Sequence, residues 1–393
     1  MQRLYADIFC KNLKAGRCMR VFHLITHFDL GGAERVAANI AESATPGIHY
    51  HMVEIMRGNS AYTPRFIDEL RSANVHIHRS VVPDINWHFL VQRIAALLFP
   101  LRLLYIILRW RPDVIHSHTE TPDLALYVAS LMLPKRIFRN VRIVRTIHNT
   151  RLWTGLDGVG RRVEAFYRRH NASIAISHSV RNAYAERYGV EAPIIHNGVA
   201  EEKHPQTFEP LMPDRINILF AGRLEPQKGV STLCEVLKRL AADQRYFFTI
   251  AGDGTQRPLV EQTISCGGVD GTPLTNARLL PPVFSLASYM SSFDYLFMPS
   301  EFEGLSMLSM EASINRLPVI ANRAPGLSDT LPDDWPLMVS DNNVDDWAAL
   351  FGSYLPTVNR QQLVDKAHSF AVEHFSVRKM QERYEEVYNN KKV

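Results

Sequence analysis

The stretch ILFAGRLEPQKGVSTL, Ile218 to Leu233, has the pattern of a buried strand, a loop and the start of a helix. The apolar run ends at Gly222, and a helical pattern begins after Gly229. A strand that leads through a short loop into a helix is half of a βαβ unit, and repeated units of this kind build parallel sheets. The stretch therefore predicts an α/β fold, with its loop at the carboxyl end of a strand, where such sheets bind ligands.

Strand-like segments followed by helix-like segments recur along the rest of the chain. Before this stretch they include RVFHLIT, YHMVEI, DVIHSH, VRIVRTIH and SIAI, and after it they include YFFTIAG, YLFMPS and PVIAN. The alternation lapses in EEKHPQTFEPLMPDR, which has three prolines and no periodicity. For a chain of 393 residues we expect two Rossmann-like domains that face each other across a cleft.

The predicted boundaries follow from these patterns. Residues 1–18 precede the first strand and are expected to be an extension. The first Rossmann-like domain is expected at 19–200, the linker at 201–215 and the second domain at 216–375. Residues 376–393 are expected to form a C-terminal helix.

Composition and charge narrow the class of protein. With 46% hydrophobic and 21% charged residues the chain resembles a globular protein, and its four cysteines form no CxxC pair that would predict a zinc site. Residues 1–200 hold 26 Lys and Arg against 15 Asp and Glu, whereas residues 201–393 hold 18 against 25. A basic front half predicts an anionic partner, either a phosphate-bearing substrate or a membrane surface, and an unevenly charged solvated surface is the alternative.

The most apolar region, residues 89–110, is interrupted by three arginines and Pro100. Its apolar runs are far shorter than the ~20 residues of a membrane-spanning helix. Helical spacing of its apolar residues predicts a helix that packs in the core or, as the alternative, docks on an anionic membrane. The residues at this spacing are Leu90, Ile94, Leu97, Leu101, Leu104 and Leu108.

Two motifs in the second half predict a phosphate site. Arg223 and Lys228 lie at a strand end beside a helix N-terminus, where fixed positive charge and free backbone N–H groups can bind a diphosphate. A solvated basic loop is the alternative, and the bracketing Gly222 and Gly229 favour the clamp. Further on, Gly252-Asp-Gly254 follows a strand without the third glycine of a dinucleotide fingerprint, which predicts either a turn lining a nucleotide or a plain turn.

The stretch EFEGLSMLSME, Glu301 to Glu311, places carboxylates at both ends of an apolar run. If a helix follows Gly304, Glu303 and Glu311 lie roughly 12 Å apart at 1.5 Å per residue. That span suits a nucleotide-sugar, whose sugar and ribose hydroxyls can donate hydrogen bonds to the two carboxylates. The alternative is that Glu303 caps the helix and Glu311 meets solvent or an internal partner.

Together these motifs resemble the retaining glycosyltransferases of family 4, which have the GT-B fold. The resemblance rests on GRLEPQKG, AGDG and PSEFEGLSMLSMEASINRLPVIA, where Glu303 and Glu311 reproduce the E-x7-E motif. THFDLGGAERVAANIA is similar to the family's glycine-rich loop, and DVIHSH, TIHN and IIHNGV fall where the family pattern leads one to expect them. The resemblance covers most of the chain from Met19.

The resemblance implies a role for each matching residue of the second domain. Arg223 and Lys228 would bind the donor diphosphate, Glu303 the donor sugar and Glu311 the ribose. The amides of Gly304, Leu305 and Ser306 would lie beside the sugar and the phosphate.

In the first domain, the resemblance implies that Gly31 and Gly32 approach the phosphate and that His118 lies near the reacting sugar. A histidine satisfied by the core is the alternative for His118. His148 and Asn197 are candidates for the cleft lining. The resemblance also implies that the C-terminal helix packs back on the first domain.

The implied activity is transfer of a sugar, with retention, from a nucleotide-sugar to a glycan or lipid-linked acceptor in surface polysaccharide or lipopolysaccharide biosynthesis. UDP is preferred over GDP on general frequency alone. No cofactor, no metal and no nucleic acid partner are expected, and the chain has no DxD sequence. We expect a cytoplasmic protein that can associate with the inner face of the membrane. Two alternatives stay open: a nucleotide-sugar epimerase of similar fold, and a catalytically inactive nucleotide- or glycan-binding protein.

Overall fold

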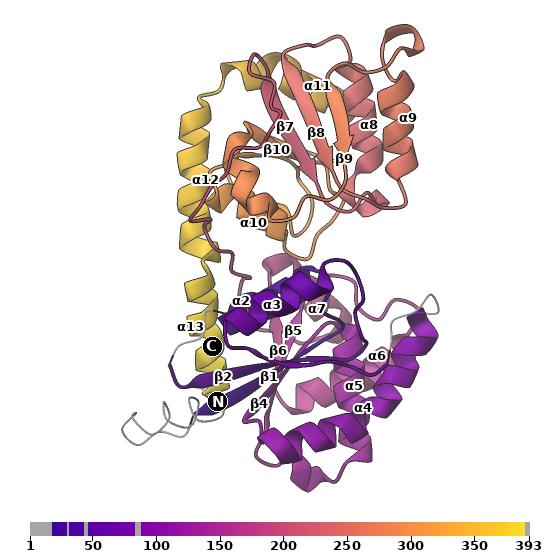
Figure 1. Cartoon of the computed structure of the whole chain (residues 1–393), viewed down its shortest axis with the longest axis vertical. Coiled ribbons are helices and arrows are strands. Elements are labelled where there is room, and N and C mark those ends of the chain that lie inside the picture. Colours follow the sequence, from indigo (N-terminus) through magenta and orange to yellow (C-terminus); the bar gives the residue numbers. More distant parts are fainter. Residues whose placement is uncertain (1–17, 30, 43–45, 83–87, 390–393) are drawn as a thin grey trace. The chain divides into compact units, whose positions relative to one another are not determined.

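The computed structural model describes residues 18–29, 31–42, 46–82 and 88–389, so the predicted N-terminal extension lies outside the described residues except for Cys18. The chain forms two compact units (Figure 1). The first unit comprises the chain up to Ile176 together with Val180–Gly198 and the segment from Val377 onward. The second unit comprises Ser177–Ser179 and Val199–Ser376.

The first unit is built on a six-stranded parallel sheet with the strand order β3-β2-β1-β4-β5-β6. This is the doubly wound order, in which the chain reverses direction across the sheet between β1 and β4. Ligands bind at such a switch point because the flanking loops diverge there. The strands are β1 (Met19–Ile25), β2 (Ile48–Glu54), β3 (His76–His78), β4 (Val114–His118), β5 (Arg142–Ile147) and β6 (Ser173–Ala175).

Helices connect these strands and cover the sheet. They are α2 (Gly32–Glu42), α3 (Thr63–Ser72), α4 (His88–Trp110), α5 (Glu120–Met132), α6 (Asp157–Arg169) and α7 (His178–Tyr188). The C-terminal helix α13 (Val377–Tyr388) also belongs to this unit. It is anchored to the sheet by a hydrogen bond between the Tyr388 hydroxyl and His116 Nδ1 (2.9 Å) and by one that Gln381 Nε2 donates to the Tyr50 hydroxyl (2.9 Å).

The second unit repeats the doubly wound order, β12-β11-β10-β7-β8-β9, with its switch point between β7 and β10. Its strands are β7 (Ile216–Ala221), β8 (Tyr246–Ala251), β9 (Ala277–Leu280), β10 (Tyr295–Met298), β11 (Val319–Asn322) and β12 (Met338–Val339). Its helices are α8 (Val230–Arg239), α9 (Arg257–Cys266), α10 (Met307–Ile314), α11 (Val344–Ala349) and α12 (Arg360–Phe375). Its shorter helical turns are η2 (Pro226–Lys228), η3 (Val269–Gly271), η4 (Leu286–Ser292), η5 (Ser328–Thr330), η6 (Leu350–Tyr354) and η7 (Leu355–Thr357), whereas η1 (Lys135–Ile137) belongs to the first unit.

The prediction of an α/β fold with two units of parallel sheet is confirmed. The central strands β8 and β10 are buried at every residue, as expected for strands covered by helices on both faces. Such strands could be predicted because each is a continuous apolar run in the sequence. The short strands β3, β9 and β12 carry no such run and were not predicted.

A buried charge network ties β5 to its neighbouring helices in the first unit. The guanidinium of Arg145, 1% exposed, lies 2.7 Å from Asp123 Oδ2 on α5 and 2.6 Å from Glu164 Oε2 on α6. Trp153 and Tyr184 also donate hydrogen bonds to Glu164. Buried charges require partners of this kind, since an unpaired one would be strongly destabilising.

Helix α4 presents apolar side chains on two opposite faces. Its inner face, with Phe99, Leu103 and Ile106, is buried. A second stripe at helical spacing faces solvent: Leu97 (58% exposed), Leu101 (68%), Tyr105 (68%) and Leu108 (63%). Core packing, one of the two interpretations of the leucine spacing, is therefore wrong for Leu97, Leu101 and Leu108. Across the part of the chain that the structure describes, no helix has the length and apolarity that crossing a bilayer requires.

Candidate functional site

In the second unit, the loops after β7 and β10 meet because these two strands are neighbours in the sheet. Lys228, at the end of η2, places its Nζ 2.6 Å from Glu303 Oε1. Glu303 is 7% exposed, so its carboxylate is shielded from water and needs this partner. Arg223, on the same loop as Lys228, is exposed, and its positive charge helps to lower the pKa of Glu225 after the hydrogen bonds that Thr255 donates to that carboxylate.

Backbone contacts fix these two loops against each other. The Glu301 amide donates to the Gln227 carbonyl (2.9 Å), and Gln227 Nε2 donates to the Phe302 carbonyl (3.0 Å). Gly229 adopts a left-handed conformation, φ +68°, and a Cβ at this position would lie 1.8 Å from the Pro299 carbonyl oxygen. The glycine is therefore required both by its backbone conformation and by the close approach of the two loops.

The loops after β7 and β8 are joined in the same way. The Leu224 amide donates to the Asp253 carbonyl (2.8 Å), and a Cβ on Gly252 would lie 2.0 Å from the Gly222 carbonyl oxygen. Gly254 also lies against Leu224. The close backbone approach at Gly252 and Gly254 is thus an approach between two loops of the protein.

The E-x7-E segment begins as a loop and continues as α10. Two backbone hydrogen bonds hold the loop: the Glu303 amide donates to the Pro325 carbonyl and the Ser306 amide to the Gly326 carbonyl. Between them lie Gly304 and the buried Leu305. Ser306 caps α10, its hydroxyl accepting a hydrogen bond from the Ser309 amide at 3.4 Å. Glu311 is half-buried on α10, so the two carboxylates are separated by a loop and one helical turn.

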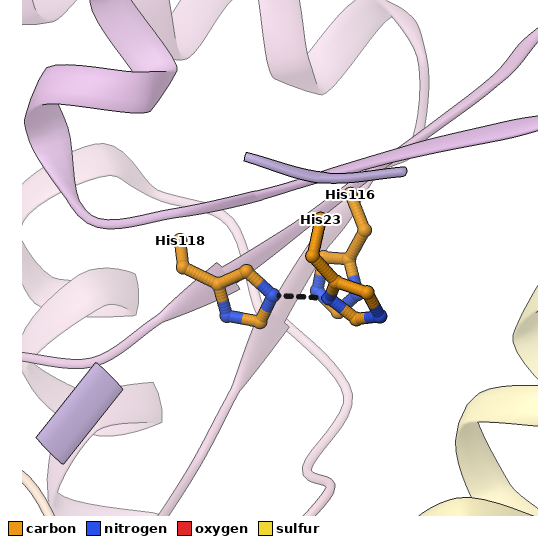
Figure 2. Close-up of side chains that lie close together, drawn as sticks. All are labelled: His23, His116 and His118. Atoms are coloured by element: carbon orange, nitrogen blue, oxygen red, sulfur yellow. Dashed lines mark hydrogen bonds between the residues drawn. The ribbon is translucent and has the colours of Figure 1, made fainter. Parts of the chain in front are cut away.

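In the first unit, histidines gather at the carboxyl ends of the strands around the β1/β4 switch point. His118 is the last residue of β4, and His148 follows directly after β5. His23 Nδ1 lies 2.8 Å from His118 Nε2, and His118 Nδ1 lies 3.1 Å from His148 Nε2. Figure 2 shows the first of these contacts, with the ring of His116 beside them. His116 itself contacts Thr146 Oγ1 at 2.7 Å and the Tyr388 hydroxyl at 2.9 Å.

Burial keeps these imidazoles neutral. It lowers the pKa of His23 to about 3, and burial together with the charge of Arg145 lowers the pKa of His148 to about 3. The pKa values of His116 and His118 are also held well below the ordinary value, first by burial and then by the neighbouring histidines. A neutral imidazole offers one N–H donor and one lone pair, so each ring can take part in one hydrogen bond of each kind.

The other predicted residues of the first unit are two glycines at the start of α2 and Asn197, which follows α7. Gly31 and Gly32 open α2, and a Cβ on Gly31 would lie 2.2 Å from the carboxylate of Glu34. Asn197 is 2% exposed, and its Oδ1 has no hydrogen-bond partner within the described residues. A buried amide oxygen of this kind is available to a ligand's hydroxyl or N–H group.

Two residues of the histidine region were missed by the sequence analysis. His23 lies on β1 directly opposite His116 in the sheet register, which becomes visible only once β1 and β4 are known to be neighbours. Thr119 follows His118 with φ +71°, an unusual backbone conformation for a β-branched residue, and its hydroxyl lies 3.0 Å from that of Thr26. The doubly wound strand order itself was the signal that could have paired β1 with β4.

Comparison with known families gives a match in each half of the chain. Residues 30–203 match the family described as Glycosyltransferase Family 4, and residues 215–355 match the family described as Glycosyl transferases group 1. The E-x7-E motif and the Lys228 loop both lie inside the second match. The histidines His118 and His148 and the glycines Gly31 and Gly32 lie inside the first.

Individual relatives agree with these matches. An uncharacterized glycosyltransferase of Methanocaldococcus jannaschii is 27% identical over 258 residues, covering 64% of this chain and 67% of that protein. The O-antigen biosynthesis glycosyltransferase WclY of Escherichia coli is 25% identical over 299 residues, covering 71% and 80%. For several other curated relatives, the match covers only about half of their length or less.

Solved structures show the same fold. The crystal structure of HepE from Anabaena, in complex with UDP and glucose, has a TM-score of 0.74 to this chain at 15% sequence identity. The match covers 95% of this chain and 100% of that one. The predicted GT-B architecture is thereby confirmed.

The buried histidines predict that the first unit loses stability in acid. Because the pKa of each buried ring lies below the ordinary 6.5, the unfolded chain binds more protons, and stability is complete above pH 6.5 and lost as the pH falls toward about 3. At pH 5 each such ring destabilises the folded state by about 2 kcal/mol.

Hydrogen exchange at pH 7.5 and 5.0, corrected for intrinsic rates, measures this loss for each unit. Peptides of the first unit should lose protection first, because the second unit contains only four of the 16 histidines, His178, His204, His368 and His374, and none of these is buried. Equal loss of protection in both units would contradict the prediction.

Gly229→Ala is expected to destabilise the second unit. The left-handed conformation alone costs about 1–2 kcal/mol for a residue with a Cβ, and the contact with the Pro299 carbonyl adds to this. Gly352→Ala is the matched control, since a Cβ there meets nothing within 4 Å. Thermal unfolding of both variants checks the prediction, and equal melting temperatures would show that the Gly229 loop adapts freely.

Proposed function

Since the chain belongs to the family 4 type of glycosyltransferases, with the GT-B fold, we propose that it transfers a sugar with retention from a UDP-sugar to a glycan or lipid-linked acceptor. The observation that carries the proposal is the Lys228–Glu303 pair at the β7/β10 switch point. It places a cation suited to a diphosphate directly beside a carboxylate suited to sugar hydroxyls.

In the proposed reaction, Arg223 and Lys228 bind the donor diphosphate, and Glu303 and Glu311 bind the sugar and the ribose. The acceptor hydroxyl attacks the anomeric carbon from the face that the nucleoside diphosphate leaves, and a phosphate oxygen of the leaving group takes the proton. The two cations stabilise the charge that develops on the leaving diphosphate. We propose that they do so without a divalent ion or any other cofactor.

The first unit is proposed to contribute the acceptor side of the site. Its candidates lie at the carboxyl ends of its strands, where Rossmann-like sheets bind ligands: His118, His148 and Asn197. Gly31 and Gly32 are proposed to approach the donor phosphate from the start of α2.

Names of similar proteins support the choice of substrates. A structural neighbour was solved with UDP and glucose, which supports a UDP-sugar donor. A relative is named for O-antigen biosynthesis, which supports an acceptor in surface polysaccharide or lipopolysaccharide assembly. We propose that this acceptor is reached from the cytoplasmic face of a membrane.

Titration of the purified chain with UDP, GDP and a panel of their sugars, followed by calorimetry, tests the donor site. We expect one nucleotide to bind, and Lys228→Ala to lower turnover by roughly 10²–10³-fold because it removes a charge from the leaving group's site. Lys238→Ala is the matched control, since Lys238 is an exposed lysine of α8 paired with Glu235.

Removing Lys228 also deprives the buried Glu303 of its partner, so Glu303→Gln is measured beside it and thermal unfolding confirms that all variants fold. Wild-type turnover in Lys228→Ala would rule out the clamp. Release of an epimerised nucleotide-sugar without any acceptor would instead favour the epimerase, and binding with neither transfer nor hydrolysis would favour a binding protein.

We propose that the outer stripe of α4 docks the protein on an anionic membrane. The stripe consists of Leu97, Leu101, Tyr105 and Leu108, and apolar patches of this kind on a protein surface mark interaction sites. Helix α5, which packs beside α4, ends with the exposed Leu131 and Met132.

Charge at this surface fits an anionic partner. Residues 85–112 and 124–156 contain no aspartate or glutamate. Exposed cations in these segments include Arg109, Lys135, Arg136 and Arg139. Each cation near an anionic bilayer contributes about 1 kcal/mol to binding, so an apolar stripe with this basic surround suits the interfacial region of the membrane.

Flotation with vesicles of phosphatidylglycerol or of phosphatidylcholine tests the docking surface. Wild-type protein should float with the anionic vesicles. The double variant Leu101→Asp with Tyr105→Asp should not, because it places charge on the side chains that would insert into the bilayer. Val372→Asp on α12 is the control, as Val372 is 42% exposed. Absence of wild-type protein from the anionic vesicles would reject the proposal, and a dimer disrupted by the same α4 variants would assign the stripe to a second copy.

A further inference from the structure

We propose that His23, His118 and His148 form one hydrogen-bonded imidazole chain in which every ring carries its proton on Nδ1. The chain ends at the Nδ1–H of His148, which we assign as the group that donates to a substrate oxygen. His118 and His23 are then positioning residues behind it. This inference rests on the proposed function for the substrate contact, whereas the order of the protons follows from the geometry alone.

A metal ion does not account for the distances. His23, His116 and His118 bring ligand atoms within 4.8 Å of one another (Figure 2). However, the 2.8 Å between His23 Nδ1 and His118 Nε2 is shorter than the roughly 3.3 Å expected for two nitrogens on one tetrahedral zinc ion. His116 is also engaged at both nitrogens, by Thr146 and by Tyr388. The contacts are therefore those of hydrogen bonds.

The direction of the chain follows from its buried end. His23 Nε2 is buried and has no hydrogen-bond partner among the described residues. A buried N–H without an acceptor is rarer than a buried lone pair without a donor, so Nε2 carries the lone pair and the proton of His23 lies on Nδ1.

The remaining protons follow in sequence. His23 Nδ1–H donates to His118 Nε2, which leaves the proton of His118 on Nδ1. His118 Nδ1–H then donates to His148 Nε2, which leaves the proton of His148 on Nδ1. Each neutral imidazole has one donor and one acceptor, so no second arrangement keeps both hydrogen bonds and also avoids a stranded N–H.

The outer end of the chain lies where a ligand is expected. Both nitrogens of His118 are occupied and its side chain is 1% exposed, so it has no nitrogen left for a substrate in this arrangement. His148 is 9% exposed and stands just past the end of β5, at the carboxyl edge of the sheet. Its Nδ1–H is a donor of fixed orientation, because the imidazole behind it fixes the tautomer.

Histidine side-chain NMR tests the proton order without any activity. Long-range ¹H–¹⁵N correlation spectra of the full chain, labelled with [¹⁵N]histidine, distinguish Nδ1–H from Nε2–H tautomers. We expect the Nδ1–H pattern at all three rings, with single substitutions used for assignment. An Nε2–H pattern at His118, or a change of these signals when one equivalent of zinc is added, would reject the proposed imidazole chain.

Paired variants test the substrate contact, because amides mimic one imidazole nitrogen each. His148→Asn places an amide N–H near the position of Nδ1, whereas His148→Gln places its amide near the position of Nε2. We expect His148→Gln to lower kcat/KM about tenfold to hundredfold, as for a lost substrate hydrogen bond, and His148→Asn to retain most of it. The opposite ranking, or equal losses, would reject His148 as the contacting group.

A second pair tests His23 as a positioning residue. His23→Asn retains a donor near Nδ1, while His23→Leu removes it and frees His118 to adopt either tautomer. We expect kcat to fall in His23→Leu with little change in KM, and His23→Asn to restore it together with the Nδ1–H signal of His118. His116→Asn is the packing control, since the ring of His116 packs beside that of His118 but is not part of the imidazole chain.

Failure of the proposed function is recognised separately. If the protein binds no nucleotide-sugar but its three histidines are Nδ1–H tautomers, the proposed function is rejected and the proton order stands. If the protein has normal transferase activity but His118 is a different tautomer, only the proposed imidazole chain is rejected.

Discussion

The ion pair between Lys228 and Glu303 depends on the order of strands in the second sheet. These residues are separated by 75 positions, and they meet because β7 and β10 are adjacent and parallel, so that the loops after both strands leave from the same edge of the sheet. Fixing the pair at 2.6 Å then requires the loops to pack without side chains between them. Gly229 against Pro299 meets this requirement, and Gly252 against Gly222 packs the loop after β8 on the loop that carries Lys228.

The first unit uses the same topology with different chemistry. At its switch point β1 and β4 bring histidines together, and burial holds them neutral at the expense of stability in acid. The Arg145 network with Asp123 and Glu164 fixes β5 to α5 and α6 and so supports the strand that leads to His148. The second unit thus offers paired charges, which suit a diphosphate, and the first unit offers neutral donors and acceptors, which suit hydroxyl groups.

Much of the fold could be predicted because it is encoded locally. Buried parallel strands are continuous apolar runs, and each is followed by a helical pattern, so α/β architecture and the division into two units were visible in the sequence. The pairing of Lys228 with Glu303 and of His23 with His118 was not visible, since both depend on which strands become neighbours. The outward leucines of α4 were misjudged for a related reason: apolar spacing places residues on one face of a helix but does not say whether that face meets the core.

Under the proposed function, the Lys228–Glu303 pair would also constrain how a donor binds. A diphosphate that takes the ammonium of Lys228 withdraws it from a carboxylate that is only 7% exposed, and an unpaired buried carboxylate is strongly unfavourable. A nucleotide that ends at its diphosphate offers nothing to replace the lost partner. A nucleotide-sugar brings hydroxyl donors to the same place, so that Glu303 exchanges an ammonium for sugar O–H groups while Lys228 turns to phosphate. Under the proposed function, the pairing of Lys228 with Glu303 would therefore link recognition of the diphosphate to recognition of the sugar, through two residues that share a single hydrogen bond.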